Sequence, residues 1–498
     1  FARCGCFKFM NQTPTPSTPQ PGTPQKATRS KLYTRWLKFV AWRRTHVPIG
    51  LSLLIMASVV GIGGGIGAWF LKWSISGLTS LVFKDLHASG FNWYLLWLPF
   101  AGILLVGCYQ RYVIHESLEH GTARISRYLA ENKFDLRPGL IYQPLLGAVV
   151  TLSAGGSAGA EGPIATAGGA IGSNVGRLFG VSPQMMRVLI GCGCGAGIAG
   201  IFKAPIAGAL FTLEVMKMRL DTITVLALIL SAVCGAMTCY TLTGYTFDVQ
   251  FMPHSFFDPS TLGWVVLLGI FLGFYSIYYN KVTSLLHKWY DGMRNPWLRN
   301  VSSAGVLAVC LVMFPCLYGE GYSTVTQLVN GNEHGWLHGT IFASFNHGEL
   351  ALICIAALLM LLKVWATIST NSGGGVAGDF APTIFAGAVA GMVFAHLMNL
   401  IPGVDLPVAL FALLGTAGAF SGIIHAPLMG MFLVAEMVGN GYGFFLPLMI
   451  CSTVSYLIVK IFTPGSRWDN GNGHDDLAAL MSSPTIAKSR FGNGSAAN

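Results

Sequence analysis

A glutamate set within long apolar sequence is the residue of this chain whose chemistry stands out first. Glu161 lies in a Gly-Ala-Glu-Gly-Pro pentapeptide, residues 159–163, and a second pentapeptide, Gly-Asp-Phe-Ala-Pro, occupies residues 378–382. An ionisable side chain within membrane-spanning sequence is costly to bury and is by default functional. A helix that restarts after a glycine–proline break presents free N–H groups and its positive dipole end to an anion. The two pentapeptides therefore predict an anion-binding site.

The two pentapeptides belong to a longer internal repeat. At a spacing of 219 residues, three glycines of the first half recur in the second: Gly159, Gly168 and Gly172 as Gly378, Gly387 and Gly391. At a spacing of 222 residues, segment 200–205 recurs as segment 422–427, and the match continues to Glu214 and Glu436. Interrupted apolar segments at matching places in two halves are typical of transporters that bind their substrate between the halves. We interpret the chain as a duplicated membrane protein.

Composition indicates a polytopic, all-α membrane protein. Charged residues make up 10% of the chain, against about 25% in a typical soluble chain, and 53% of the residues are hydrophobic. Several apolar stretches are too long for one span and too interrupted by glycine for one straight helix. The expected fold is two inverted-topology repeats of broken, tilted helices, with residues 47–245 as the first membrane repeat and 246–465 as the second.

The two ends of the chain differ from this apolar body. Residues 1–46 contain nine Lys or Arg and no Asp or Glu, which predicts a cytoplasmic N-terminus. We expect a disordered leader in this segment, followed by a basic amphipathic helix at the lipid surface. The net charge of +10 is concentrated there, and nothing else in the chain favours nucleic-acid binding. Residues 466–498 form a short polar tail, too small for an appended regulatory domain.

One catalytic pattern needs to be considered. The sequence Gly-Gly-Ser-Ala-Gly, residues 155–159, fits the G-x-S-x-G pattern of serine hydrolases. That pattern requires a strand–turn–helix context, whereas here it lies in a Gly/Ala-rich membrane segment. An intramembrane serine hydrolase is therefore a remote alternative, and we expect no enzyme. The eleven cysteines and twelve histidines match no metal-site spacing, so no metal or cofactor is expected.

These motifs together resemble the CLC family of chloride channels and proton-coupled antiporters. Residues 159–163 resemble the family's G-[K/R]-E-G-P motif, residues 378–382 match G-x-F-x-P, and residues 319–322 resemble G-x-G-Y. The resemblance covers roughly residues 48–463. It implies a homodimer in which each subunit has its own pore, made of two inverted halves, in a plasma or bacterial inner membrane.

The resemblance also implies roles for individual residues. It makes Glu161 the gate, whose carboxylate occupies the anion pathway when ionised and leaves it when protonated or displaced. The implied anion contacts are Gly159, Gly162, Gly378, Phe380, Ala381, Tyr442 and His120. Counting back from the proline of a family segment places Tyr442 at the family's tyrosine, although this chain has one extra residue between the two. His120 stands where the family has a serine. Asp379 replaces an apolar residue, and we expect its carboxylate to point toward a cation or a helix end, because it would otherwise repel anions.

The residue at position 215 leaves open whether transport is passive or coupled to protons. Chloride antiporters of the better-known type have two adjacent glutamates after the A-P-x-x-G repeat, the second relaying protons, whereas this chain has Glu214 followed by Val215. Since valine cannot titrate, passive conduction is slightly favoured over proton-coupled exchange of chloride or fluoride. A solute transporter with a similar inverted repeat is the alternative from another class. Glu214 and Glu436 are expected to hold the two repeats together.

Overall fold

The structure is a computed structural model that describes residues 31–83, 94–115, 118, 122–244, 258–332, 334–343, 348–439 and 441–463. The chain divides into two compact units, residues 1–47 and 48–498. In the first unit, helix α1 (Lys31–His46) contains the basic and aromatic residues that predicted an amphipathic segment. Residues 1–30 and 464–498 lie outside the described part of the chain, so the expectations for the leader and the tail stay predictions.

The second unit is built from helices, and its described residues contain no β-strand. Its first half contains α2 (Ile49–Phe83), α3 (Tyr94–Cys108), α4 (Ala123–Ala130), α5 (Gln143–Ser153), α6 (Glu161–Phe179), α7 (Pro183–Phe202), α8 (Pro205–Glu214) and α9 (Thr222–Thr243). Its second half contains α10 (Leu262–Asp291), α11 (Pro296–Met313), α12 (Tyr322–Val329), α13 (Glu349–Ser372), α14 (Phe380–Asn399), α15 (Val408–Ile424), α16 (Pro427–Met437) and α17 (Phe445–Phe462). Within the described ranges, nine helices are long and apolar enough to cross a membrane. The protein is an integral membrane protein.

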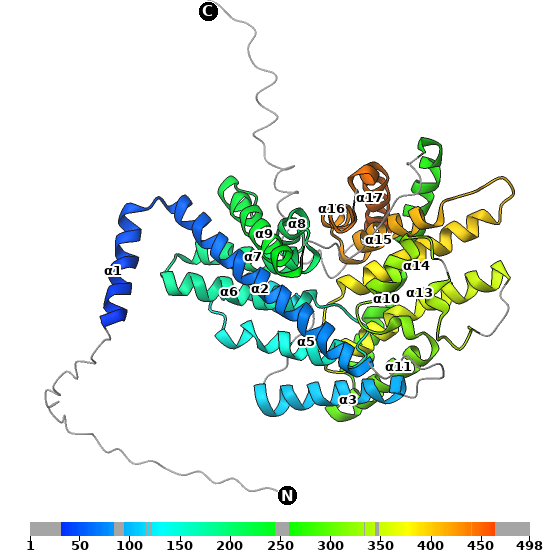
Figure 1. Cartoon of the computed structure of the whole chain (residues 1–498), viewed down its shortest axis with the longest axis horizontal. Coiled ribbons are helices and arrows are strands. Elements are labelled where there is room, and N and C mark those ends of the chain that lie inside the picture. The colour runs from blue at the N-terminus through cyan, green and yellow to red at the C-terminus, as the bar shows by residue number, and fades with distance from the viewer. Residues whose placement is uncertain are drawn as a thin grey trace, which may run out of the picture. The chain divides into compact units, whose positions relative to one another are not determined.

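The two halves pack in the same way. In the first half α6 packs on α7, and α2 and α7 both pack on α9. In the second half α14 packs on α15, and α10 and α15 both pack on α17. The short helices α8 and α16 contact each other and lie side by side between the helices of the two halves (Figure 1). The expected fold of two repeats of broken helices is confirmed.

The repeated glycines allow the paired helices to approach each other closely. A Cβ atom on Gly168 of α6 would lie 2.0 Å from the carbonyl oxygen of Gly193 in α7. A Cβ atom on Gly387 of α14 would lie 2.4 Å from the carbonyl oxygen of Gly415 in α15. The same close approach recurs one helical turn further on, at Gly172 and Gly391. Glycine recurs at these positions because two helix backbones touch there, as is common between membrane helices.

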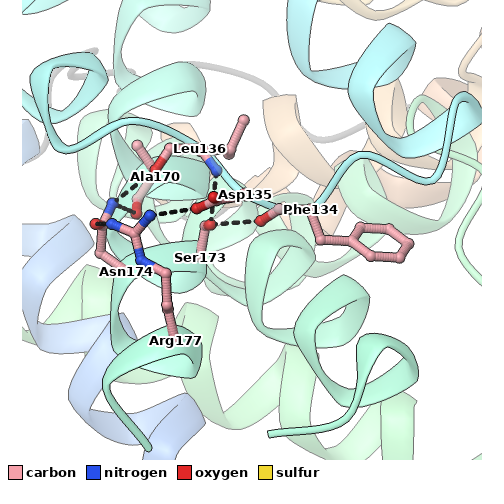
Figure 2. Close-up of polar contacts among 7 residues, drawn as sticks. All are labelled: Phe134, Asp135, Leu136, Ala170, Ser173, Asn174 and Arg177. Atoms are coloured by element: carbon pink, nitrogen blue, oxygen red, sulfur yellow. Dashed lines mark hydrogen bonds and ion pairs between the residues drawn. The ribbon is translucent and has the colours of Figure 1, made fainter. Parts of the chain in front are cut away.

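Helix α6 is anchored near its C-terminal end by the loop that precedes α5. Figure 2 shows Ser173 and Asn174 of α6 turned toward the backbone of this loop. The Ser173 hydroxyl donates to the Phe134 carbonyl at 2.6 Å and accepts from the Leu136 N–H at 3.0 Å. The Asn174 amide donates to the Leu136 carbonyl at 3.2 Å. These bonds fix the direction of the helix whose first residue is Glu161.

Candidate functional site

The two glycine–proline pentapeptides meet within the second unit. The Gly159 N–H donates to the Gly378 carbonyl at 2.8 Å, and the Gly378 N–H donates to the Gly159 carbonyl at 2.6 Å. Directly after this contact, α6 begins at Glu161 and α14 begins at Phe380. The N-termini of two helices from two repeats therefore start at one place, which we call the junction.

Two side-chain hydrogen bonds cross between the halves with the same symmetry. The Ser157 N–H donates to Thr370 Oγ1, and the Val376 N–H donates to Thr151 Oγ1, both at 3.0 Å. Ser157 and Val376 are equivalent positions of the repeat, and so are Thr151 and Thr370, because each pair is 219 residues apart. The loop before α6 is thus bonded to α13, and the loop before α14 is bonded to α5, by matching hydrogen bonds on the two sides of the junction.

The Glu161 side chain occupies the junction. It is 1% exposed, and its Oε1 atom accepts a hydrogen bond from the Tyr322 hydroxyl at 3.1 Å. Its Oε2 atom lies where side chains of Gly159 and Gly378 would be, because Cβ atoms built on those glycines would be 1.8 and 3.0 Å away. Within the described part of the chain, Oε2 has no hydrogen-bond donor. The carboxylate therefore sits between two helix N-termini that favour negative charge.

The Gly-Glu-Gly-Tyr segment, residues 319–322, supplies two further groups at the junction. Glu320 Oε1 accepts a hydrogen bond from the Ala160 N–H at 3.2 Å, and its charge interacts with that of Glu161. Tyr322, the first residue of α12, also packs its ring edge-to-face on Phe202 with centroids 6.3 Å apart. The segment is recognisable in the sequence as a motif, but the motif by itself predicts no role for Glu320 or Tyr322.

A buried lysine reaches the same loop from α13. Lys363 is 0% exposed, and its ammonium donates a hydrogen bond to Ser157 Oγ at 2.9 Å. The ammonium also lies 4.6 Å from the centre of the Phe385 ring in α14. Lys363 was not predicted from the sequence, because a lone lysine in an apolar helix belongs to no motif.

A serine next to a lysine is also the pairing of some hydrolases, in which the lysine acts as base. Ser157 is 0% exposed, and the segment that precedes its loop is helix α5 rather than the strand that a nucleophile elbow needs. The surroundings of Ser157 therefore do not support the hydrolase alternative. Among the residues that the structure describes, no group of three or more His, Cys, Asp or Glu is placed to hold a metal ion.

The structure brings most of the predicted anion contacts together. Five of them belong to the two pentapeptides at the junction: Gly159, Gly162, Gly378, Phe380 and Ala381. Phe380 is buried between the rings of Phe211 and Phe420, with centroids 5.8 and 5.1 Å away. Its side chain thus serves packing, and the predicted contact rests on its backbone N–H at the start of α14.

Of the two remaining predicted contacts, one lies away from the junction and the other falls outside the described residues. Tyr442 lies in the short turn η6 (Gly441–Phe444), is 51% exposed, and stacks on Phe445 with centroids 6.2 Å apart. The described residues show no contact between Tyr442 and Glu161. His120 lies outside the described part of the chain, so its role stays a prediction.

Asp379 is turned toward neighbouring helices. Its Oδ1 atom accepts a hydrogen bond from the Asn371 amide of α13 at 2.7 Å. The side chain is thus turned to an amide of a neighbouring helix, whereas the sequence predicted a cation or a helix end.

Helices α8 and α16 cap each other. Glu214, the last residue of α8, accepts two backbone N–H groups from the first turn of α16 at 3.0 and 2.7 Å. Glu436 of α16 accepts two from the first turn of α8 at 3.0 and 2.8 Å. Each carboxylate compensates the positive end of the other repeat's helix. The expectation that these two glutamates hold the repeats together is confirmed.

Comparison with known proteins agrees with this architecture. The family model described as "Voltage gated chloride channel" matches residues 101–460. The chain is 29% identical over 429 residues to a putative chloride channel protein ClcB-like of Ralstonia nicotianae, covering 81% of this chain and 93% of that protein. It is 28% identical over 430 residues to the H(+)/Cl(-) exchange transporter ClcA of Klebsiella pneumoniae, covering 82% and 86%.

The fold is also found among solved structures. A slow cyanobacterial Cl-/H+ antiporter superposes with a TM-score of 0.69 at 24% identity, covering 88% of this chain and 99% of that one. The family match spans well over half of the chain and includes both pentapeptides of the junction. The chain therefore belongs to the CLC family.

Proposed function

We propose that the protein exchanges chloride or a similar small anion for protons across a membrane, with Glu161 as the gate. The observation that carries this proposal is the position of the Glu161 carboxylate, buried where α6 and α14 begin. A carboxylate at a site that attracts anions competes with the transported anion for that site. Protonation removes the negative charge and releases the side chain, so one group responds to both the anion and the proton.

Exchange is supported over passive conduction by the relatives. The similar protein of Klebsiella pneumoniae is named an exchange transporter, and the similar cyanobacterial structure is that of an antiporter. The slight preference for a channel that followed from Val215 is therefore set aside. A passive channel remains the second candidate because of that same residue, which is 7% exposed and cannot carry a proton.

The proton in this proposal reaches Glu161 without a titratable side chain at position 215. Glu214, directly before it, is occupied by its two bonds to α16. Two titratable groups lie directly at the gate: Glu320 accepts a hydrogen bond from the Ala160 N–H, and the Tyr322 hydroxyl donates to Glu161. We propose that these two groups, together with water, carry the proton.

The assembly and the orientation are part of the proposal as well. We place the protein as a homodimer in a plasma or bacterial inner membrane, in contact with lipid, with the N-terminus in the cytoplasm. The nine basic residues of segment 1–46 support that orientation. Ile55, Ile62 and Ile66 of α2, each about half exposed, provide apolar surface for lipid or for a second subunit.

The test is reconstitution in liposomes with simultaneous recording of chloride and proton movement. Exchange predicts that a chloride gradient drives protons uphill at a fixed ratio. Chloride flux without uphill proton movement would favour the channel. The absence of any anion flux from correctly folded protein would overturn both.

A further inference from the structure

Lys363 is a fully buried amine inside a membrane-spanning helix. Its exposed fraction is 0%, and its ammonium makes one hydrogen bond, to Ser157, and one ring contact, with Phe385. Among the described residues, no carboxylate lies within ion-pair distance of this ammonium. Burying a charge without a close counter-charge costs free energy, and such residues in membrane helices are retained for function.

The duplicated architecture does not require this lysine. The position equivalent to Lys363 in the first repeat is Pro144, and the position equivalent to Ser157 in the second repeat is Val376. Both are buried and apolar, so the same place in the other half packs without a polar pair. The pair formed by Lys363 and Ser157 is therefore an asymmetric addition to a symmetric scaffold, and it joins α13 of the second half to the loop that leads to the gate.

Two contacts connect Lys363 to the gate. Ser157 lies four residues before Glu161 in the same loop, so the ammonium is fixed to the segment that carries the gate. Phe385, under the ammonium, packs against the backbone directly before Tyr322, whose hydroxyl donates to Glu161.

Other ionisable groups face the same region. Glu320 has the same sign of charge as Glu161, whereas Lys72 of α2 has the opposite sign. Cys316, in the turn η4 (Pro315–Leu317), is the remaining titratable neighbour of Lys363. Lys72 is partly exposed to solvent and is therefore more strongly screened than the buried Lys363. Lys72 and Lys363 are therefore the two cations among these groups.

We propose that Lys363 is a positioning residue for the Glu161 gate. Its ammonium, held by Ser157 and Phe385, favours the ionised carboxylate at the junction and also strengthens binding of the anion that replaces it. The proposal rests on the proposed function and adds to it the residue that sets the pH of gating and the affinity for the anion.

The experiment compares Lys363→Met, which removes the charge at similar volume, with Lys363→Arg, which keeps it. Anion flux is recorded against pH in liposomes, and chloride binding is measured by calorimetry at fixed pH. For Lys363→Met we expect the pH of half-maximal flux to rise by on the order of one pH unit and chloride affinity to fall about tenfold. Lys363→Arg should stay close to the unmodified protein in both.

The matched control is Ser369→Ala on the same helix. Ser369 is buried and hydrogen-bonded to the Tyr290 hydroxyl at 2.9 Å, away from the junction. This variant loses a buried hydrogen bond of α13, and it should change neither the pH profile nor the chloride affinity. A purely structural role of Lys363 would make Lys363→Met behave like this control, with lower yield and an unchanged profile, and would overturn the proposal.

Two further variants keep the test decisive. If Lys363→Met does not fold, Ser157→Ala removes the hydroxyl that holds the ammonium. This variant should raise the pH of half-maximal flux by a smaller amount, and no shift would refute the inference.

In a Glu161→Gln background, Lys363→Met should leave the pH profile unchanged. A pH response that survives Glu161→Gln would show that the gate assignment has failed, independently of Lys363.

Discussion

Gly159 and Gly378, 219 residues apart in the sequence, exchange two backbone hydrogen bonds of 2.8 and 2.6 Å. This contact brings the starts of α6 and α14 together, one from each repeat. The Glu161 carboxylate fits against it because neither residue has a side chain, and a Cβ on Gly159 would lie 1.8 Å from Oε2. The site is therefore the joint product of the two halves.

Gly159→Ala should displace the gate. The added methyl group would occupy the place of the Glu161 carboxylate oxygen, so the carboxylate must leave the junction. We expect anion flux that depends less on pH, measured in liposomes over a pH series. Gly305→Ala in α11 is the control, because its Cβ would make only an ordinary contact of 3.8 Å with Phe100. A pH response that is unchanged in Gly159→Ala would contradict the placement of the carboxylate.

Tyr322→Phe should make the gate easier to protonate. The variant removes the hydroxyl that donates to Glu161 Oε1 at 3.1 Å, and a hydrogen bond to a charged group is worth about 1.5–3 kcal/mol. Since this bond favours the ionised carboxylate, the pH of half-maximal flux should rise by roughly one to two units. Tyr290→Phe removes a buried hydrogen bond to Ser369 instead and should leave the profile in place. Equal profiles for the two variants would exclude Tyr322 from gating.

Glu436→Ala should destabilise the contact between the repeats without changing the gate. It leaves two N–H groups of the first turn of α8 without their carboxylate, at a cost of about 1–2 kcal/mol. Glu214→Ala is its symmetric counterpart at α16 and should cost a similar amount. Thermal unfolding of the protein in detergent measures the effect, and the pH profile of flux should stay unchanged. A large effect of one variant and none of the other would show that the two caps are not equivalent.

Gly193→Ala and Gly415→Ala should both lower the yield of folded protein. Their Cβ atoms would lie 1.9 and 2.2 Å from backbone carbonyl oxygens of the partner helices, so α6 and α7, or α14 and α15, must separate. Overpacking of this kind costs about 1–3 kcal/mol or more. Gly77→Ala in α2 has no atom within 4 Å of the new Cβ and serves as the control. Normal yield of both test variants would refute the packing explanation of the repeated glycines.

The sequence was most informative where the chemistry is local. The glycine–proline pentapeptides mark helix breaks by their own residues, so the repeat, the two helix starts and the importance of Glu161 could be predicted. That Glu214 and Glu436 hold the repeats together was also predictable, because the two carboxylates recur at matching places of the repeat. That each binds the first turn of the other repeat's helix was not, because those bonds join segments more than 210 residues apart.

Contacts between distant segments were harder to predict. The bond between Lys363 and Ser157 joins residues 206 positions apart, and neither side chain has an equivalent in the repeat that could have pointed to it. Tyr442, by contrast, was predicted as an anion contact and does not lie at the junction. Its prediction relied on counting back from one proline across one extra residue. In the structure its ring is half exposed and stacks on Phe445. Such placements depend on how helices pack, which a local motif does not encode.

In the proposed mechanism, the Glu161 carboxylate is the gate that couples anion and proton. Its most direct test is flux through Glu161→Gln protein in liposomes, with chloride and protons recorded together over a pH series. We predict that chloride flux persists, that it no longer depends on pH, and that uphill proton movement is lost. Glu214→Gln should keep both the pH response and the coupling. Unchanged pH dependence and proton coupling in Glu161→Gln, or the same loss in Glu214→Gln, would contradict the account.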